Sequence, residues 1–248
     1  IFISQGSRLK LFYEVMLGMK KAITFHNIGF YAADSRFFDH FKRQCPEIES
    51  KSILMLKEWD IVRESQNIIP DIPLLKQYER EIGDPFLWNA LVGDRRIYSG
   101  KRHAFAQDYK PKFTHEEMLA ILQCGLQRME QFFDSVQPNL VVSFQCVTLG
   151  EYLSFLFAKA RGIPLLNLRP TRINNYIYAG EDVLEPSKKL YGTYQHFIEN
   201  GIERPLKATV SKYLENMRET HAMYEGVVPP SSKPPSNSSP KKSFLKNS

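Results

Sequence analysis

The sequence has few of the residues that build disulfide frameworks and zinc sites. Only three of its 248 residues are cysteine, Cys45, Cys124 and Cys146, and none belongs to a CxxC pair. A sparse, odd set of thiols at these spacings fits neither a disulfide framework nor a structural zinc site. Because such thiols persist reduced in a reducing compartment, we expect a cytoplasmic protein.

Paired histidines and long apolar runs are missing as well. The six histidines form no HxH, HExxH or HxxxH pair, so we expect no metal and no other cofactor. The most apolar region, residues 140–158, is interrupted by Gln145 and Glu151. It is therefore not the continuous stretch of about 20 apolar residues that crosses a bilayer.

A strong excess of charge is absent from most of the chain. The net charge is +6, and four lysines in residues 229–248, a segment without acidic residues, supply +4 of it. Since the remainder is nearly balanced, we expect no nucleic-acid partner. Peripheral contact of the basic tail with the inner membrane stays open.

What the sequence does contain is an alternation of apolar strands and amphipathic helices. Strands are predicted over residues 1–4, 28–33, 52–56, 140–144 and 163–168, and helices over 7–19, 35–44, 72–82, 86–91, 114–134, 148–160 and 206–224. Residues 140–168 form a βαβ unit with a right-handed crossover. The pattern predicts an α/β fold, a Rossmann-like parallel sheet flanked by helices.

Composition changes divide the chain into three parts. We expect a Rossmann-like domain over 1–180, a helical extension over 181–228 and a disordered Pro/Ser/Lys-rich linker or tail over 229–248. The chain begins without Met inside an apolar run. We therefore expect a fragment of a longer protein.

The first candidate site follows the first predicted strand. Gly6, Ser7 and Arg8 stand where a parallel sheet binds ligands, outside the carboxyl ends of its strands. Glycine permits close backbone approach, and the next helix offers free N–H groups. The alternative is an ordinary tight turn.

A second candidate site lies in residues 93–111, a polar and basic segment expected to be a long loop. Arg95 and Arg96 have guanidinium groups suited to phosphate or carboxylate oxygens. Asp94 or Asp108 could act as a base toward a sugar hydroxyl. The alternative is a network of Asp–Arg ion pairs that holds the loop together.

Two further candidates follow the strands of the βαβ unit. Thr148 is the expected cap of the helix after residue 144, a role compatible with ligand contact. Arg169 and Arg172 follow the next strand and could bind an anion, or could belong to a basic surface loop. Cys146, nearby, is expected to be a small buried thiol rather than a nucleophile.

These stretches resemble the N-terminal Rossmann-like domain of two-domain GT-B type glycosyltransferases. The resemblance covers residues 1–175 and is carried by Pro138-Asn139-Leu140-Val141-Val142, by the Thr148-capped helix and by Ala160-Arg161-Gly162-Ile163-Pro164 with the strand ending at Arg169. The stretches Glu58-Trp59-Asp60, Asp94-Arg95-Arg96 and Gln107-Asp108-Tyr109 resemble bacterial capsular or surface polysaccharide biosynthesis proteins of that group.

The resemblance implies the acceptor-side part of a glycosyltransferase with a nucleotide-sugar donor and a saccharide acceptor. It also implies a C-terminal donor-binding domain, which nothing in these residues resembles. Asp94 or Asp108 would be the base, and the arginines would hold anionic groups. The alternatives are a non-catalytic binding or scaffold domain in polysaccharide assembly or export, and a sugar-nucleotide 2-epimerase.

Overall fold

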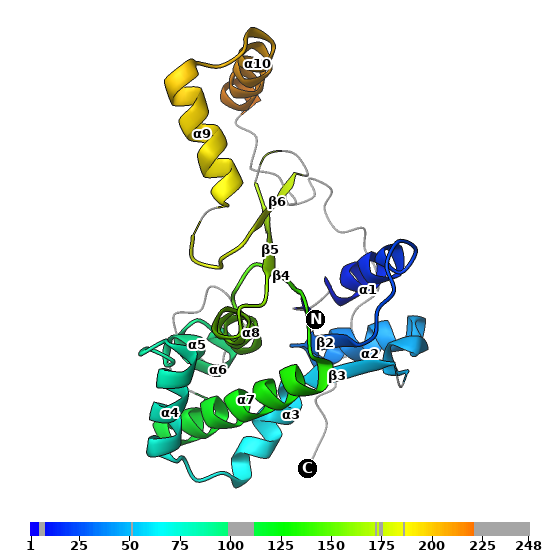
Figure 1. Cartoon of the computed structure of the whole chain (residues 1–248), viewed down its shortest axis with the longest axis vertical. Helices are drawn as coiled ribbons and strands as arrows, with labels where there is room; N and C mark the ends of the chain where they lie inside the picture. Colours follow the sequence, from blue (N-terminus) through cyan, green and yellow to red (C-terminus); the bar gives the residue numbers. More distant parts are fainter. Residues whose placement is uncertain are drawn as a thin grey trace, which may run out of the picture. The chain divides into compact units, whose positions relative to one another are not determined.

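The computed structural model of the chain describes residues 1–4, 8–50, 52–98, 112–171, 173, 176–185 and 187–220 (Figure 1). Contacts divide the chain into two compact units. The first unit contains residues 1–169 and 177–196, and the second contains residues 170–176 and 197–248. In the described part of the chain no helix is long and apolar enough to cross a membrane. The tail expected over 229–248 lies outside the described residues.

A six-stranded sheet confirms the predicted α/β, Rossmann-like fold. Its strands are β1 (Phe2–Ser4), β2 (Ile28–Ala32), β3 (Ile53–Lys57), β4 (Val141–Phe144), β5 (Leu165–Pro170) and β6 (Ile177–Gly180). Their order across the sheet is β3-β2-β1-β4-β5-β6. The four pairings among β1 to β5 are parallel. Residues 171–176 are too few for a crossover, so β6 returns antiparallel beside β5.

Alternating side chains of the strands belong to two hydrophobic cores, one on each face of the sheet. Phe2 and Phe30 stack at 5.0 Å between ring centroids and belong to a cluster with residues of α1 (Arg8–Met19) and α2 (Ser35–Gln44). Ile3 and Tyr31, one residue further along each strand, belong to the opposite cluster. Because the side-chain period of a strand is two, one short strand serves both faces.

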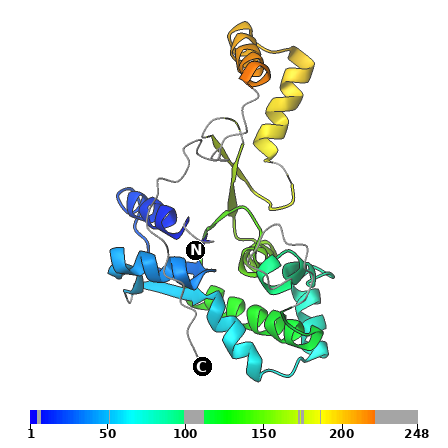
Figure 2. The ribbon, with the colours of Figure 1, turned by 180° about the vertical axis from the view of Figure 1, so that it is seen from behind.

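The second face is covered by α7 (His115–Val136) and α8 (Leu149–Ala160), which lie against the sheet on the side away from α1 and α2 (Figures 1 and 2). The shorter helices beside them are α3 (Glu58–Glu64), α4 (Ile72–Ile82), α5 (Asn89–Val92) and α6 (Arg95–Tyr98). Two helices follow the sheet along the chain, α9 (Lys188–Asn200) and α10 (Arg204–Thr220).

The structure departs from the sequence prediction in the middle of the chain. Residues 95–98 form α6 and not a loop, because their helix starts on Asp94, whose side chain accepts the backbone N–H of Arg96. The helix predicted over 86–91 begins later, at Asn89. The helix α3 and the edge strand β6 were not predicted, since both are too short for a clear apolar period.

Candidate functional site

The strand order points to one edge of the sheet as the place for a ligand. The order reverses between β1 and β4, and doubly wound sheets bind ligands outside the carboxyl ends of their strands at such a point. The segments that leave this edge are the turn after β1, the start of α2 after β2, the start of α3 after β3 and the start of α8 after β4. Residues 5–7 of the first turn, including Gly6 and Ser7, lie outside the described residues.

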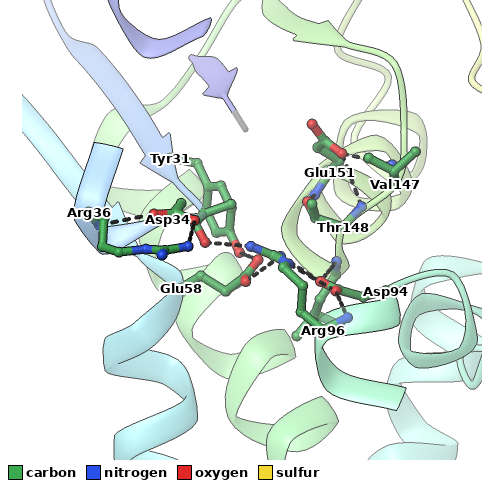
Figure 3. Close-up of polar contacts among 11 residues, drawn as sticks. Tyr31, Asp34, Arg36, Glu58, Asp94, Arg96, Val147, Thr148 and Glu151 are labelled. Carbon is green, nitrogen blue, oxygen red and sulfur yellow. Dashed lines mark hydrogen bonds and ion pairs between the residues drawn. The ribbon is translucent and has the colours of Figure 1, made fainter. Parts of the chain in front are cut away.

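Four buried or half-buried polar side chains meet at this edge, and we call them the carboxylate–arginine cluster: Tyr31, Glu58, Asp94 and Arg96 (Figure 3). The Arg96 guanidinium donates to Glu58 Oε1 at 2.5 Å, to Asp94 Oδ2 at 2.7 Å and to the carbonyl of Ala33. The Tyr31 hydroxyl donates to Glu58 Oε2 at 2.5 Å. One cation therefore bridges two carboxyl groups that come from distant parts of the chain.

Asp94 ties this cluster to the start of α8. Its Oδ1 accepts the backbone N–H and Nε of Arg96, and its Oδ2 accepts the backbone N–H of Leu149 at 3.0 Å. The side chain is buried. A carboxylate at a helix N-terminus is stabilised by the helix dipole and satisfies an N–H that the helix itself leaves unpaired.

The same helix start is closed by a reciprocal cap. The Thr148 hydroxyl accepts the N–H of Glu151, and Glu151 Oε2 accepts the N–H groups of Thr148 and Val147 (Figure 3). Thr148 is thus the helix cap that its sequence predicts, and it is buried. Because the chain's own carboxylates occupy these N–H groups, the start of α8 is not an open anion site.

Burial alters the acidity of Glu58, one of the two carboxyl groups of the cluster. Burial raises its pKa to about 8, and the negative charges of Asp94 and Glu151 act in the same direction, against the lowering effect of Arg96 and Tyr31. The main physical cause is desolvation, because a buried carboxylate loses its hydration, and the Arg96 guanidinium, which is shared with Asp94, offsets this loss only in part.

Beside the cluster lies a pocket of about 250 Å³, which we call the edge pocket. It opens where β2 and β3 end and α2 and α3 begin. Its lining residues are Ala33, Asp34, Ser35, Arg36, Glu58, Trp59, Val62, Arg96, Ile97, Lys112 and Phe113. Three cations, two carboxyl groups and an indole thus surround this space.

The cations of the edge pocket differ in how firmly they are held. Arg96 is fixed by the bonds given above, whereas the Arg36 side chain is 79% exposed and lies 3.9 Å from Asp34. Lys112 lies over the Phe113 ring at 4.8 Å. Arg36 and Lys112 are therefore available to an anionic group, while Arg96 and Glu58 line the pocket with side chains that hydrogen bonds hold in place.

The sequence-predicted residues divide into three groups. Asp94, Arg96 and Thr148 come together at one edge. Arg169 is held elsewhere, by Asn167 Oδ1 at 2.7 Å and by the carbonyl of Asp182 at 2.6 Å, where it ties β5 to the segment after β6. Asp108 and Arg172, like Gly6 and Ser7, lie outside the described residues. Arg8 is in α1 and Arg95 in α6, and the positions of their side chains lie outside the description.

Sequence reasoning did not select Tyr31, Arg36, Glu58 or Lys112. The available signal was position, since Glu58 directly follows a strand and Asp34 and Arg36 follow the strand before it. In a parallel sheet, polar residues just after neighbouring strands meet at one edge.

The described residues contain no group of three or more His, Cys, Asp or Glu side chains that could hold a metal ion. Comparisons of this chain with protein-family models, with curated proteins and with solved structures find no match.

Proposed function

We propose that this chain is the acceptor-side domain of a glycosyltransferase that acts in bacterial surface or capsular polysaccharide synthesis. The observation that supports this most is the edge pocket, which combines the exposed cations Arg36 and Lys112, an aromatic wall and a buried carboxyl group of raised pKa at the ligand edge of a Rossmann-like sheet. Groups of this kind bind a sugar that carries a phosphate or carboxylate.

In the proposed reaction the acceptor hydroxyl attacks the anomeric carbon of a nucleotide-sugar donor. The bond from that carbon to the diphosphate oxygen breaks, the nucleoside diphosphate leaves, and the hydroxyl proton passes to a base. We assign the base to Glu58, because it lines the edge pocket and its pKa of about 8 makes its ionised form, a minor fraction at neutral pH, basic enough to take the hydroxyl proton.

Asp94 has a different role in this proposal. It does not line the edge pocket, and its two oxygens accept hydrogen bonds from Arg96 and Leu149. It positions Arg96, which in turn holds Glu58. In this proposal Arg36 and Lys112 hold the anionic group of acceptor or donor, a role that the resemblance implied for other arginines of the chain.

The first test is binding. Saturation-transfer NMR of the chain with acidic oligosaccharides and with a panel of nucleotide sugars should show contact with the sugar protons. Replacing both Arg36 and Lys112 by Ala should weaken binding of the acidic ligands at least tenfold, because two exposed cations are lost. Replacing Arg43 and Arg63, which are not part of the pocket lining, should leave binding unchanged.

The second test separates an enzyme from a binding domain. In the full-length protein, Glu58→Gln should abolish sugar transfer while it keeps acceptor binding. If this variant transfers sugar at the normal rate, Glu58 is not the base. If the full-length protein binds saccharides but never transfers one, the chain belongs to a scaffold for polysaccharide assembly.

A further inference from the structure

Helix α10 (Arg204–Thr220) exposes an apolar face. Leu206, Val210 and Leu214 recur every four residues, and their exposed fractions are 40%, 42% and 44%. Tyr213 and Met217 lie on the same face and are half-buried. At 3.6 residues per turn these five side chains occupy an arc of about 100°. An amphipathic helix normally buries such an apolar arc against another surface.

Positive charge borders this arc. On the helical wheel Lys207 and Arg218 follow the apolar arc directly, and Arg204 lies next to them. The acidic residues Glu215 and Glu219 lie on the opposite side of the helix. Lys212 lies on that side too, beside the acidic residues. Lys207 and Arg218 are thus the cations placed where the apolar face meets the polar face, and the acidic residues are placed farthest from the apolar face.

The charge of the surrounding sequence has the same sign. Residues 197–248 contain eight Lys and Arg against five Asp and Glu, a net charge of +3. This is half of the chain's net charge of +6, carried by about a fifth of its residues. Four of these lysines follow α10 in a segment without acidic residues. A negatively charged partner is attracted to this part of the chain more than to the rest.

A second helix repeats the apolar pattern. In α9 (Lys188–Asn200), Leu190, Tyr191, Tyr194 and Ile198 lie on one face and are 47–60% exposed. Tyrosine has an apolar ring and a polar hydroxyl, and such side chains favour the boundary between lipid headgroups and acyl chains.

We propose that α10 binds the surface of an anionic phospholipid membrane. The helix would lie in the plane of the interface, with Leu206, Val210 and Leu214 among the outer acyl carbons and with Lys207 and Arg218 at the phosphates. The complementary charge selects this occupant over a second copy of the chain, whose α10 would meet the first with cations of the same sign. The proposal does not depend on the proposed function.

The test is flotation of the 248-residue chain with lipid vesicles. We expect binding to phosphatidylcholine vesicles with about 30% phosphatidylglycerol, and binding at least tenfold weaker to phosphatidylcholine alone. Raising the salt from about 0.1 M to about 0.5 M should release the chain, since the Debye length shortens. Equal binding to both vesicles, or no binding, would overturn the proposal.

Two variants and one matched control locate the contact. Replacing Leu206, Val210 and Leu214 by Ser, or Lys207 and Arg218 by Glu, should each lower binding at least tenfold. The control replaces three exposed apolar residues of the first unit, Ile69, Phe86 and Val92, by Ser and should bind as the unchanged chain does. Circular dichroism verifies that each variant keeps its helix content.

A spectroscopic measurement covers the case in which the serine variant loses its helix. A tryptophan placed by Leu214→Trp should be quenched by brominated lipid, while Trp59 and Trp88 of the first unit should not.

Light scattering tests whether a second copy of the chain covers the apolar face instead of a membrane. If the chain is a dimer that the serine variant dissociates, and the tryptophan introduced by Leu214→Trp is not quenched, the apolar face is a contact between copies and the proposal is wrong.

Discussion

At the scale of single residues, Arg96 is the side chain on which the candidate site depends. It bridges Glu58 and Asp94, and both carboxyl groups are buried. Removing it with Arg96→Ala leaves two carboxyl groups without their cation, and such a loss costs about 3–5 kcal/mol. The free energy of unfolding in urea measures this cost.

Arg36→Ala is the matched control for that prediction. Arg36 lines the same pocket, but its side chain is 79% exposed and its nearest carboxylate oxygen is 3.9 Å away. An exposed pair of this kind contributes about 0–1 kcal/mol, so the control should unfold almost as the unchanged chain does. Equal effects of the two substitutions would show that the cluster does not stabilise the fold.

Glu58 gives a prediction about pH. Its pKa is about 8 in the folded chain against 4.5 as the ordinary value, so between these limits the folded chain keeps a proton that the unfolded chain releases. The stabilising contribution is complete below pH 4.5 and is lost as the pH rises through 8. Within this window the free energy of unfolding should fall by about 1 kcal/mol per pH unit.

Glu58→Gln should remove this slope. The glutamine side chain carries no titrating proton, yet it can accept from Arg96 and pair with the Tyr31 hydroxyl. Urea unfolding of both chains at a series of pH values compares the slopes. If the slope persists in the variant, another group of the fold causes it.

At the scale of elements, α8 approaches the sheet through a glycine. A Cβ atom at Gly150 would overlap the Tyr31 ring, which is fully buried and bonded to Glu58. Gly150→Ala should therefore cost about 3 kcal/mol, because the ring has no space to move into. The mid-point of thermal unfolding reports the loss.

Gly18→Ala in α1 is the corresponding control, because a Cβ atom there would meet nothing within 4 Å. Alanine has the higher helix propensity, so this substitution should leave stability unchanged or raise it by up to about 1 kcal/mol. A loss at position 18 as large as at position 150 would mean that glycine matters for its backbone and not for the Tyr31 contact.

The elements themselves were largely predictable, whereas the site was predictable only in part. The helices 35–44 and 72–82 were predicted with their observed ends, the first because Asp34 can be recognised as its cap and the second because Gly83 ends it. The ion pair of Asp94 with Arg96 was among the alternatives that the sequence offered. The bond of Asp94 to Leu149 was not predicted, since Leu149 is 55 residues away. Periodicity shows which face of an element is buried, but it does not show which distant backbone group a buried carboxylate meets.

At the scale of the whole molecule, α10 should be dispensable for the first unit. None of its described side chains is buried, and it belongs to the second unit. A chain that ends at residue 203 should therefore keep its melting temperature within about 2 °C, because no core contact is lost. Differential scanning calorimetry measures this directly. A drop as large as that of Arg96→Ala would contradict the division into two units.

The central place of β1 has a consequence for how the protein is made. Its two neighbours are β2 and β4, and Phe2 is paired with both Phe30 and Val142. During synthesis one edge of β1 stays open until more than a hundred further residues have left the ribosome. Contacts of such long sequence separation form slowly, and an open apolar edge favours aggregation meanwhile. Nascent chains stopped before Val142 should therefore be bound by chaperones, and chains that include β4 should be released.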